Sequence, residues 1–215
     1  MTQLLATATG ALLLTAVLIL WGRSMTGAAG LLAVQGVALA GLAVSASEGG
    51  HAEVYAMAAL LALVKAGLIP ALLLRTTGRL GSGLQADASP VVNPTTAMLL
   101  AALLTTVAFL ASRPLVADSD RSTAQAIPVG IAVVLIGFLV LTTRRQALAQ
   151  VVGFVVVDNG IGATAVLAAG GLPAIVELGV LADVVLVVVI LIVLTRRIDR
   201  VFGGTGLRQL SELRD

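Results

Sequence analysis

The stretch QVVGFVVVDNGIGATAVLAAGGLPAIVELGVLADVVL, from Gln150 to Leu186, holds two long apolar runs separated by the break GGLP. A helix needs about 20 mostly apolar residues to cross the hydrocarbon core of a bilayer, and about 17 is a short limit. Both runs reach that length when they are extended to 148–169 and 173–195. Backbone groups in lipid must be hydrogen-bonded internally, and these runs do not alternate in polarity, so the stretch predicts two membrane-spanning helices.

The rest of the chain repeats this pattern. Five further apolar stretches of about this length lie at 4–21, 28–46, 54–74, 95–111 and 127–143. The breaks between them are rich in glycine, proline and charged residues, which is typical of loops. No basic residue precedes the first stretch and no small-residue cleavage site follows it, so we interpret it as a span and not as a signal peptide. The sequence predicts an all-α, multi-pass membrane bundle of about seven helices.

The composition narrows the functions that the chain can have. Of 215 residues, 59% are hydrophobic and 11% are charged, which excludes an ordinary soluble domain and a disordered chain. There is no Cys and one His, so thiolate metal sites, iron–sulfur clusters and disulfides are excluded and a His-based metal centre is disfavoured. With 3% aromatic residues the chain offers no stacking platform for nucleic acid. We expect a lipid-embedded protein with no cofactor and no metal of its own.

No motif of a catalytic site occurs in the chain. We find no G-x-S-x-G nucleophile elbow, no phosphate-binding Walker loop and no dinucleotide fingerprint between a strand and a helix. The glycine-rich segment GGTG, Gly203 to Gly206, has no following lysine and is interpreted as a linker. The chain is therefore expected to have no catalytic residues, and whether it belongs to an enzyme is left open at this point.

The arginines predict the orientation of the chain. Lys65 lies inside a span, and ten of the twelve arginines fall on one side of the predicted membrane. The positive-inside rule then places the N-terminus outside and the C-terminus in the cytoplasm. The longest loop, 76–94, suggests a division into units. We expect N-terminal helices in 1–80, a linker and a fourth helix in 81–125, a three-helix unit in 126–195, and a cytoplasmic tail in 196–215.

Four ionisable residues lie within or at the edge of predicted spans: Lys65, Asp158, Glu177 and Asp183. A lysine or aspartate at a helix centre costs roughly 2.5–3.5 kcal/mol, so three such groups would cost about 8–10 kcal/mol without partners. That sum is comparable to the stability of a whole domain. Pairing, protonation or water must offset it.

Residue counts place these groups in one layer. Asp158 and Asp183 are each about 12 residues from the turn at Gly170, hence roughly 18 Å deep on an antiparallel pair, and Lys65 is near the same midplane. Glu177 lies nearer the outside. The layer fits a path for protons or cations, because carboxylates bind and release protons while a lysine tunes its neighbours. The alternative is a structural ion pair of Lys65 with one aspartate, which would hold helices together.

Three polar residues are secondary candidates for the site: Gln35, Asn159 and Glu53. Gln35 lies five residues after Gly30, as Asp158 lies five after Gly153, and either a duplicated three-helix unit or similar composition explains this echo. Asn159 is expected to contribute to the path or to cap a locally opened turn. Glu53 is expected at a solvated outer rim, with a role in proton exit as the alternative. Pro70 is expected to kink the third span.

The quoted residues resemble a known family. Gln150 to Leu186 is similar to the region of hydrogenase-4 component E in which G-F-L-x-L-E-N-G-I is followed by a proline and V-E-L-G-V-L-x-D. EVYAMAALLALVKAGLIPALLLR, Glu53 to Arg75, resembles the lysine-bearing helix of that family, which is followed by Ile-Pro. The resemblance covers roughly 20–80 and 125–215. The last three helices of that family are in turn similar to the small K component of respiratory complex I and to the small C component of multisubunit cation/proton antiporters.

The resemblance implies a non-catalytic membrane subunit of a formate hydrogenlyase-type complex in a bacterial or archaeal cytoplasmic membrane. It implies antiporter-like membrane subunits as partners, with peripheral NiFe and iron–sulfur subunits reached through them. Asp158 takes the place of the family's glutamate and is one methylene shorter, and Asp183 stands at a second carboxylate position. Two alternatives remain, a subunit of a multisubunit cation/proton antiporter and a purely structural scaffold.

Overall fold

A computed structural model of the chain describes residues 2–47, 52–79, 92–117, 122–144, 146–170 and 179. By its internal contacts the chain divides into the units Met1–Glu177 and Leu178–Asp215, and all elements described below belong to the first. The predicted seventh span apart from residue 179, the tail, Glu177 and Asp183 lie outside the described residues.

The described elements are helical throughout, as the sequence predicts, and six of the helices are long and apolar enough to cross a membrane. Each begins within three residues of its predicted start. The spans are α1 (Thr2–Trp21), α2 (Met25–Ala46), a third span built from α3 (Ala52–Ala62), η1 (Leu63–Leu68) and α4 (Ile69–Arg79), then α6 (Pro94–Ala111), α8 (Ile127–Thr143) and α9 (Ala147–Ala169). The short helices α7 (Arg113–Ala117) and η2 (Ser122–Ala126) lie in a segment expected to be a loop.

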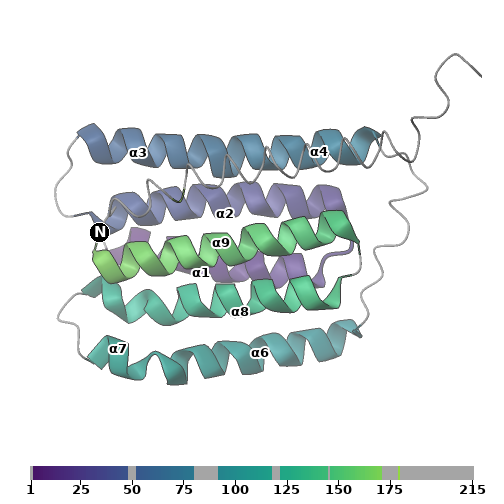
Figure 1. Cartoon of the computed structure of the whole chain (residues 1–215). Helices are drawn as coiled ribbons and strands as arrows, with labels where there is room; N and C mark the ends of the chain where they lie inside the picture. Colours follow the sequence, from purple (N-terminus) through teal and green to yellow (C-terminus); the bar gives the residue numbers. More distant parts are fainter. Residues whose placement is uncertain are drawn as a thin grey trace, which may run out of the picture. The chain divides into compact units, whose positions relative to one another are not determined.

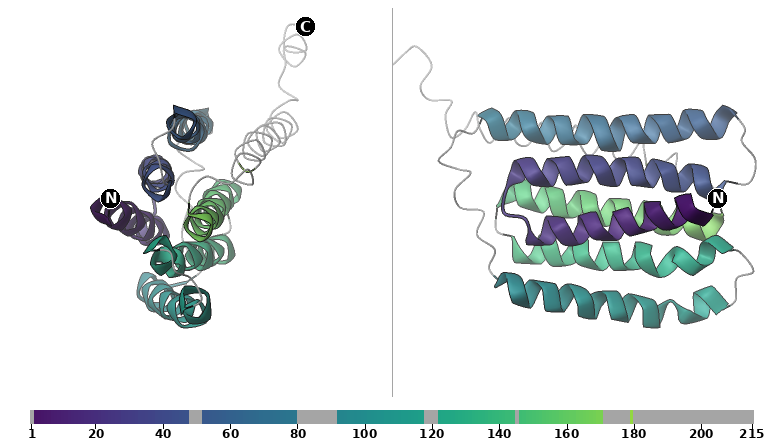
Figure 2. Two further views of the ribbon diagram at one scale, coloured as in Figure 1. Left: turned by 90° about the vertical axis from the view of Figure 1, so that its left-hand side faces the viewer. Right: turned by 180° about the vertical axis from the view of Figure 1, so that it is seen from behind.

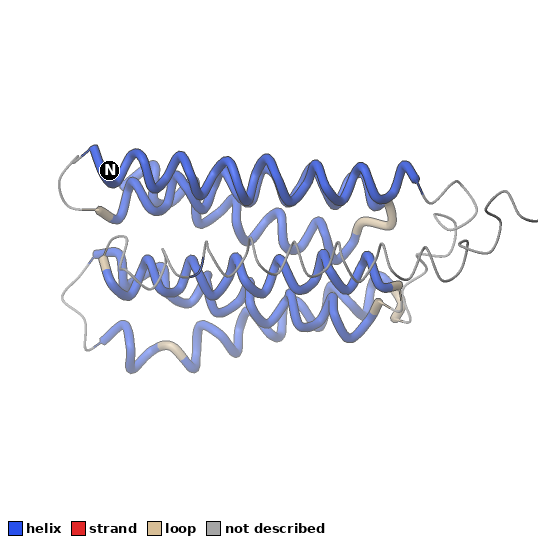
Figure 3. The backbone as a smooth tube through the Cα atoms, turned by 45° about the horizontal axis from the view of Figure 1, so that its top comes forward, coloured by secondary structure: helices blue, strands red, loops and turns tan. Residues whose placement is uncertain are grey.

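Four of the spans form the centre of this unit. Helices α1, α2, α8 and α9 contact one another, as α1 packs on α2 and α8 while α9 packs on α2 and α8. The third span packs against α2, and α6 packs against α8, so these two lie at opposite sides of the central four (Figures 1 and 2). The tube view shows that the described residues are almost all helical, with a short loop between α1 and α2 at 22–24 (Figure 3).

Glycines let α8 and α9 approach backbone to backbone. They recur at seven-residue spacing on both helices: Gly130 and Gly137 on α8, Gly153 and Gly160 on α9. A Cβ at Gly160 would lie 2.6 Å from the backbone nitrogen of Val134, and one at Gly137 would lie 2.7 Å from that of Val157. Small residues at such contacts are what drives helix association in lipid, where apolar side chains gain little from burial.

The third span contains a π-helical segment just before Pro70, the residue at which the sequence predicts a kink. This segment, Leu63–Leu68, ends just before Pro70, and the backbone N–H of Ile69 bonds to the carbonyl of Val64, five residues earlier. Proline has no N–H to donate and its ring crowds the carbonyl four residues before it. A widened turn accommodates both effects and keeps the span helical.

Candidate functional site

Lys65 and Asp158 form an ion pair between the third span and α9. Lys65 is 4% exposed, whereas the Asp158 side chain is 28% exposed. Asp158 is the middle residue of the 23-residue helix α9, and Lys65 lies near the middle of its own span, inside the π-helical segment. At a rise of 1.5 Å per residue, Asp158 is roughly 17 Å from either end of its helix. An ion pair of Lys65 with one aspartate at a common depth is the alternative that the sequence left open beside an ion path.

A second pair of polar side chains links α1, α2 and α9. The amide of Asn159 donates from Nδ2 to Oε1 of Gln35 over 2.9 Å, and Gln35 donates from Nε2 to the carbonyl oxygen of Leu12 over 3.2 Å. Both amide side chains are fully buried. Helix α9 is continuous here, so Asn159 joins helices instead of capping an opened turn. Gln35 therefore bonds to Asn159, the neighbour of the residue that matches it in the echo between Gly30 and Gly153.

The carbonyl of Leu12 fixes the polarity of both amides. Because a carbonyl only accepts, Gln35 must turn its nitrogen to Leu12 and its oxygen to Asn159. Asn159 must then present its nitrogen, which leaves its Oδ1 pointing away from Gln35. This buried oxygen has no hydrogen-bond partner among the described residues. A buried acceptor without a donor costs about 1–3 kcal/mol, so a hydrogen bond donated to Oδ1 of Asn159 would be favourable.

Gly36 brings the two polar pairs next to each other. A Cβ at Gly36 would lie 2.6 Å from the backbone nitrogen of Ala66 and 2.6 Å from the carbonyl carbon of Lys65. The backbone of α2 therefore touches the π-helical segment directly, beside Gln35. Gln35 is near the centre of the 22-residue helix α2, so the amide pair and the ion pair share one layer of the bundle. We call Gln35, Lys65, Asp158 and Asn159 the central polar cluster.

The other residues singled out from the sequence lie elsewhere. Glu53 is exposed in the first turn of α3, and its place at an outer rim stays a prediction; Glu177 and Asp183 lie outside the described residues. Within the described ranges, no group of three or more His, Cys, Asp or Glu side chains is placed to hold a metal ion. The central polar cluster is therefore the part of the predicted site that the structure brings together.

Sequence reasoning missed the structural role of Arg144, which it treated only as a cytoplasmic charge. Arg144 is 5% exposed, and its Nη2 donates to the carbonyl of Leu20 over 2.9 Å and to that of Gly22. These carbonyls end α1, where a cation also meets the negative end of the helix dipole. Burial lowers the pKa of Arg144, and the nearby charge of Arg23 lowers that pKa further.

The chain is similar to proteins from several bacteria. A relative in Mycobacterium tuberculosis, the uncharacterized protein Rv0085, is 42% identical over 210 residues, which are 97% of this chain and 94% of the relative. Hydrogenase-4 component E of Escherichia coli K12 is 27% identical over 121 residues, and the protein of that name in Shigella flexneri matches equally. That match covers 56% of this chain and 56% of component E. No family model and no solved structure matches the chain.

Proposed function

The chain belongs to the same family as the uncharacterized protein Rv0085 of Mycobacterium tuberculosis, and we propose that it is a membrane subunit of a hydrogenase-4-type complex, lining a proton or Na⁺ path. The proposal is supported by six membrane-long helices and by the partial similarity to hydrogenase-4 component E. Its partners would be antiporter-like membrane subunits and, through them, peripheral NiFe and iron–sulfur subunits. The complex would lie in a bacterial or archaeal cytoplasmic membrane, with the C-terminus of this chain in the cytoplasm.

The observation that carries the proposal is the ion pair of Lys65 and Asp158 at the middle of the bundle. An ion pair at this depth is stable only while both charges face each other, because an isolated charge in the bilayer centre is costly. A displacement of Lys65 would oblige the Asp158 carboxylate to take up a proton or to meet water. Opening and closing the pair would therefore couple a movement of the third span to proton transfer.

The π-helical segment that contains Lys65 supports a movement of this residue. Single π-turns occur inside α-helices frequently at functional sites, and their hydrogen bonds run to the fifth residue instead of the fourth. Lys65 lies in this segment, and Asn159 next to Asp158 holds a buried acceptor without a described donor. Glu177 and Asp183 would continue the path toward the outside and across the layer, as their residue counts predict.

A scaffold function is the second candidate, and the same ion pair favours it. The pair joins the third span to α9, while the amides join α9 to α2 and α1. Such links could serve only to hold helices in register. The two candidates predict different results for a double variant that lacks both charges but still packs its helices. A scaffold would leave proton translocation intact, whereas a proton path would lose it.

Membership of the complex has its own test. We expect an affinity-tagged chain, solubilised in a mild detergent, to copurify with subunits that carry nickel, iron and labile sulfide. Metal analysis of the purified material measures this, and untagged membranes provide the control. Copurification with cation/proton antiporter subunits alone, without nickel or iron, would contradict the hydrogenase proposal and favour the antiporter alternative.

A further inference from the structure

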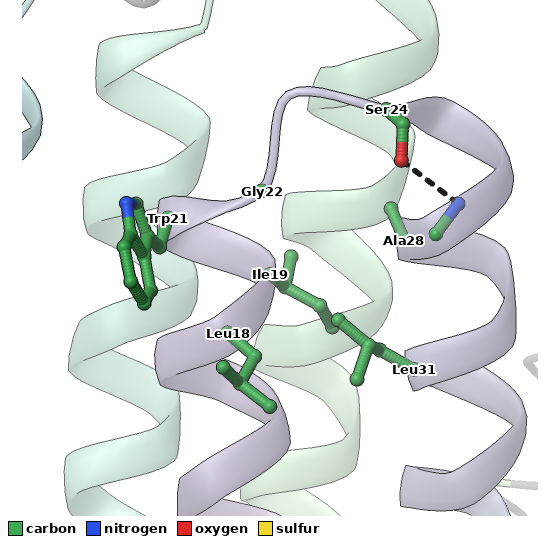
Figure 4. A pocket seen from close by; sticks show the side chains of 8 residues that line it. Leu18, Ile19, Trp21, Gly22, Ser24, Ala28 and Leu31 are labelled. Atoms are coloured by element: carbon green, nitrogen blue, oxygen red, sulfur yellow. Dashed lines mark hydrogen bonds between the residues drawn. The ribbon is translucent and has the colours of Figure 1, made fainter.

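A groove lies between the end of α1 and the start of α2 (Figure 4). Its volume is about 320 Å³. Leu18 and Ile19 on α1 and Leu31 on α2 form an apolar floor, and Ile19 and Leu31 point toward each other. Trp21 and Ser24 line it at the turn between the two helices. The groove is therefore apolar along the helices and polar at the helix ends.

Two arginines lie beside the polar end of this groove. A smaller cavity of about 10 Å³ shares Gly22, Ser24 and Ala28 with the groove and is also lined by Arg23 and Arg144. Arg23 is exposed, and it forms no ion pair with any described side chain. The charge of Arg23 makes the charged form of Arg144 less favourable, and burial does the same more strongly. An anion bound near both groups would reduce this repulsion.

The order of these features along the helix axis matches an amphiphile. The apolar floor belongs to the membrane-spanning parts of α1 and α2. Trp21 is 61% exposed and lies at the end of α1, and tryptophan is enriched at the membrane interface. Basic pockets between spans at this level bind anionic lipid headgroups. We propose that the groove binds an anionic phospholipid, with an acyl chain on the apolar floor and the phosphate beside Arg23.

Trp21 makes the proposal directly measurable, because it is the single tryptophan of the chain. The full chain is reconstituted in phosphatidylcholine nanodiscs in which a minor fraction of the lipid is brominated phosphatidylglycerol or, in parallel, brominated phosphatidylcholine. We expect the brominated phosphatidylglycerol to quench Trp21 more strongly, as an enrichment of about fivefold near the groove would produce. One cationic side chain at the membrane surface contributes about 1 kcal/mol to the binding of an anionic lipid, which corresponds to this factor. Equal quenching by the two lipids would show that lipid reaches the groove without regard to its charge, and would overturn the proposal.

Three variants separate a binding groove from general surface attraction. Arg23→Gln and the groove-filling Ala28→Phe should each abolish the preference for phosphatidylglycerol. Arg75→Gln removes an exposed arginine at the end of the third span and should leave the preference unchanged. A preference that survives Arg23→Gln, or that is lost equally in Arg75→Gln, would overturn the proposal. Because Arg23 is exposed and its replacement should not impair folding, it decides the question even if Ala28→Phe misfolds.

Discussion

At the scale of single residues, the central polar cluster depends on charges and amides that satisfy one another. Lys65 is almost completely buried, and its charge is stabilised by Asp158 on another helix. Gln35 and Asn159 form a chain of donors and acceptors that starts at the carbonyl of Leu12. Removing one member of such a set leaves its partner without compensation, whereas removing both can be nearly neutral.

This asymmetry predicts the stability of charge variants. Lys65→Met or Asp158→Leu alone should each destabilise the folded chain by about 3–5 kcal/mol, because one charge stays buried without its partner. The double variant should recover most of that loss. Unfolding in detergent mixtures measures the free energies, with Glu53→Gln as a control at an exposed position. Additive losses in the double variant would show that the two charges do not interact.

The sequence singled out all four residues of this cluster but did not predict the hydrogen bond between the two amides. Lys65 and Asp158 could be placed at one depth because helix rise converts residue counts into distance, and ionisable residues inside apolar runs are conspicuous. The bond between Gln35 and Asn159 could not be predicted, since it depends on which faces of α2 and α9 meet. The burial of Arg144 was missed because an arginine just after a span is ordinarily a solvated charge.

At the scale of elements, close contacts between helix backbones hold the bundle together. Gly160 faces Val134 of α8 and Gly36 faces the π-helical segment, whereas a Cβ added at Gly30 would meet no heavy atom of another described element within 4 Å. A side chain at the first two positions must push backbones apart. At Gly30 the same change adds only a methyl group on an open surface.

The glycines therefore give a matched pair of variants. Gly160→Ala should lower the thermal stability of the purified chain, because its Cβ would collide with the backbone of α8. Gly30→Ala should leave stability unchanged or raise it by up to about 1 kcal/mol, since alanine favours helix more than glycine does. Thermal unfolding followed by circular dichroism compares them. If both variants behaved alike, tight packing of α8 on α9 would not be a source of stability.

The existence and starts of the six described spans were predictable, while their inner irregularities and the short helices α7 and η2 were not. Apolar length and glycine- or proline-rich breaks determine where spans begin and end. Pro70 indicated a disturbance of the third span, but whether a proline produces a kink or a widened turn depends on the packing around it. Here Gly36 brings α2 against the backbone of that turn.

At the scale of the whole molecule, the arginine distribution predicts how the chain is oriented. The chain has no native cysteine, so single introduced cysteines report on topology without interference. Thr26→Cys, in the first turn of α2, should react with a membrane-impermeant thiol reagent only from the cytoplasmic side. Glu53→Cys, in the first turn of α3, should react from the outside in intact cells. The reverse labelling pattern would contradict the positive-inside assignment.

The central claim is that the Lys65–Asp158 pair takes part in moving protons and does more than join helices. The most direct test is proton translocation by the intact complex in sealed vesicles, with the double variant Lys65→Met/Asp158→Leu, which replaces both charges by apolar side chains of similar size. We predict a complex that assembles and still transfers electrons but no longer changes the pH inside the vesicles. Normal translocation by the assembled double variant would contradict the claim and leave the pair with a structural role.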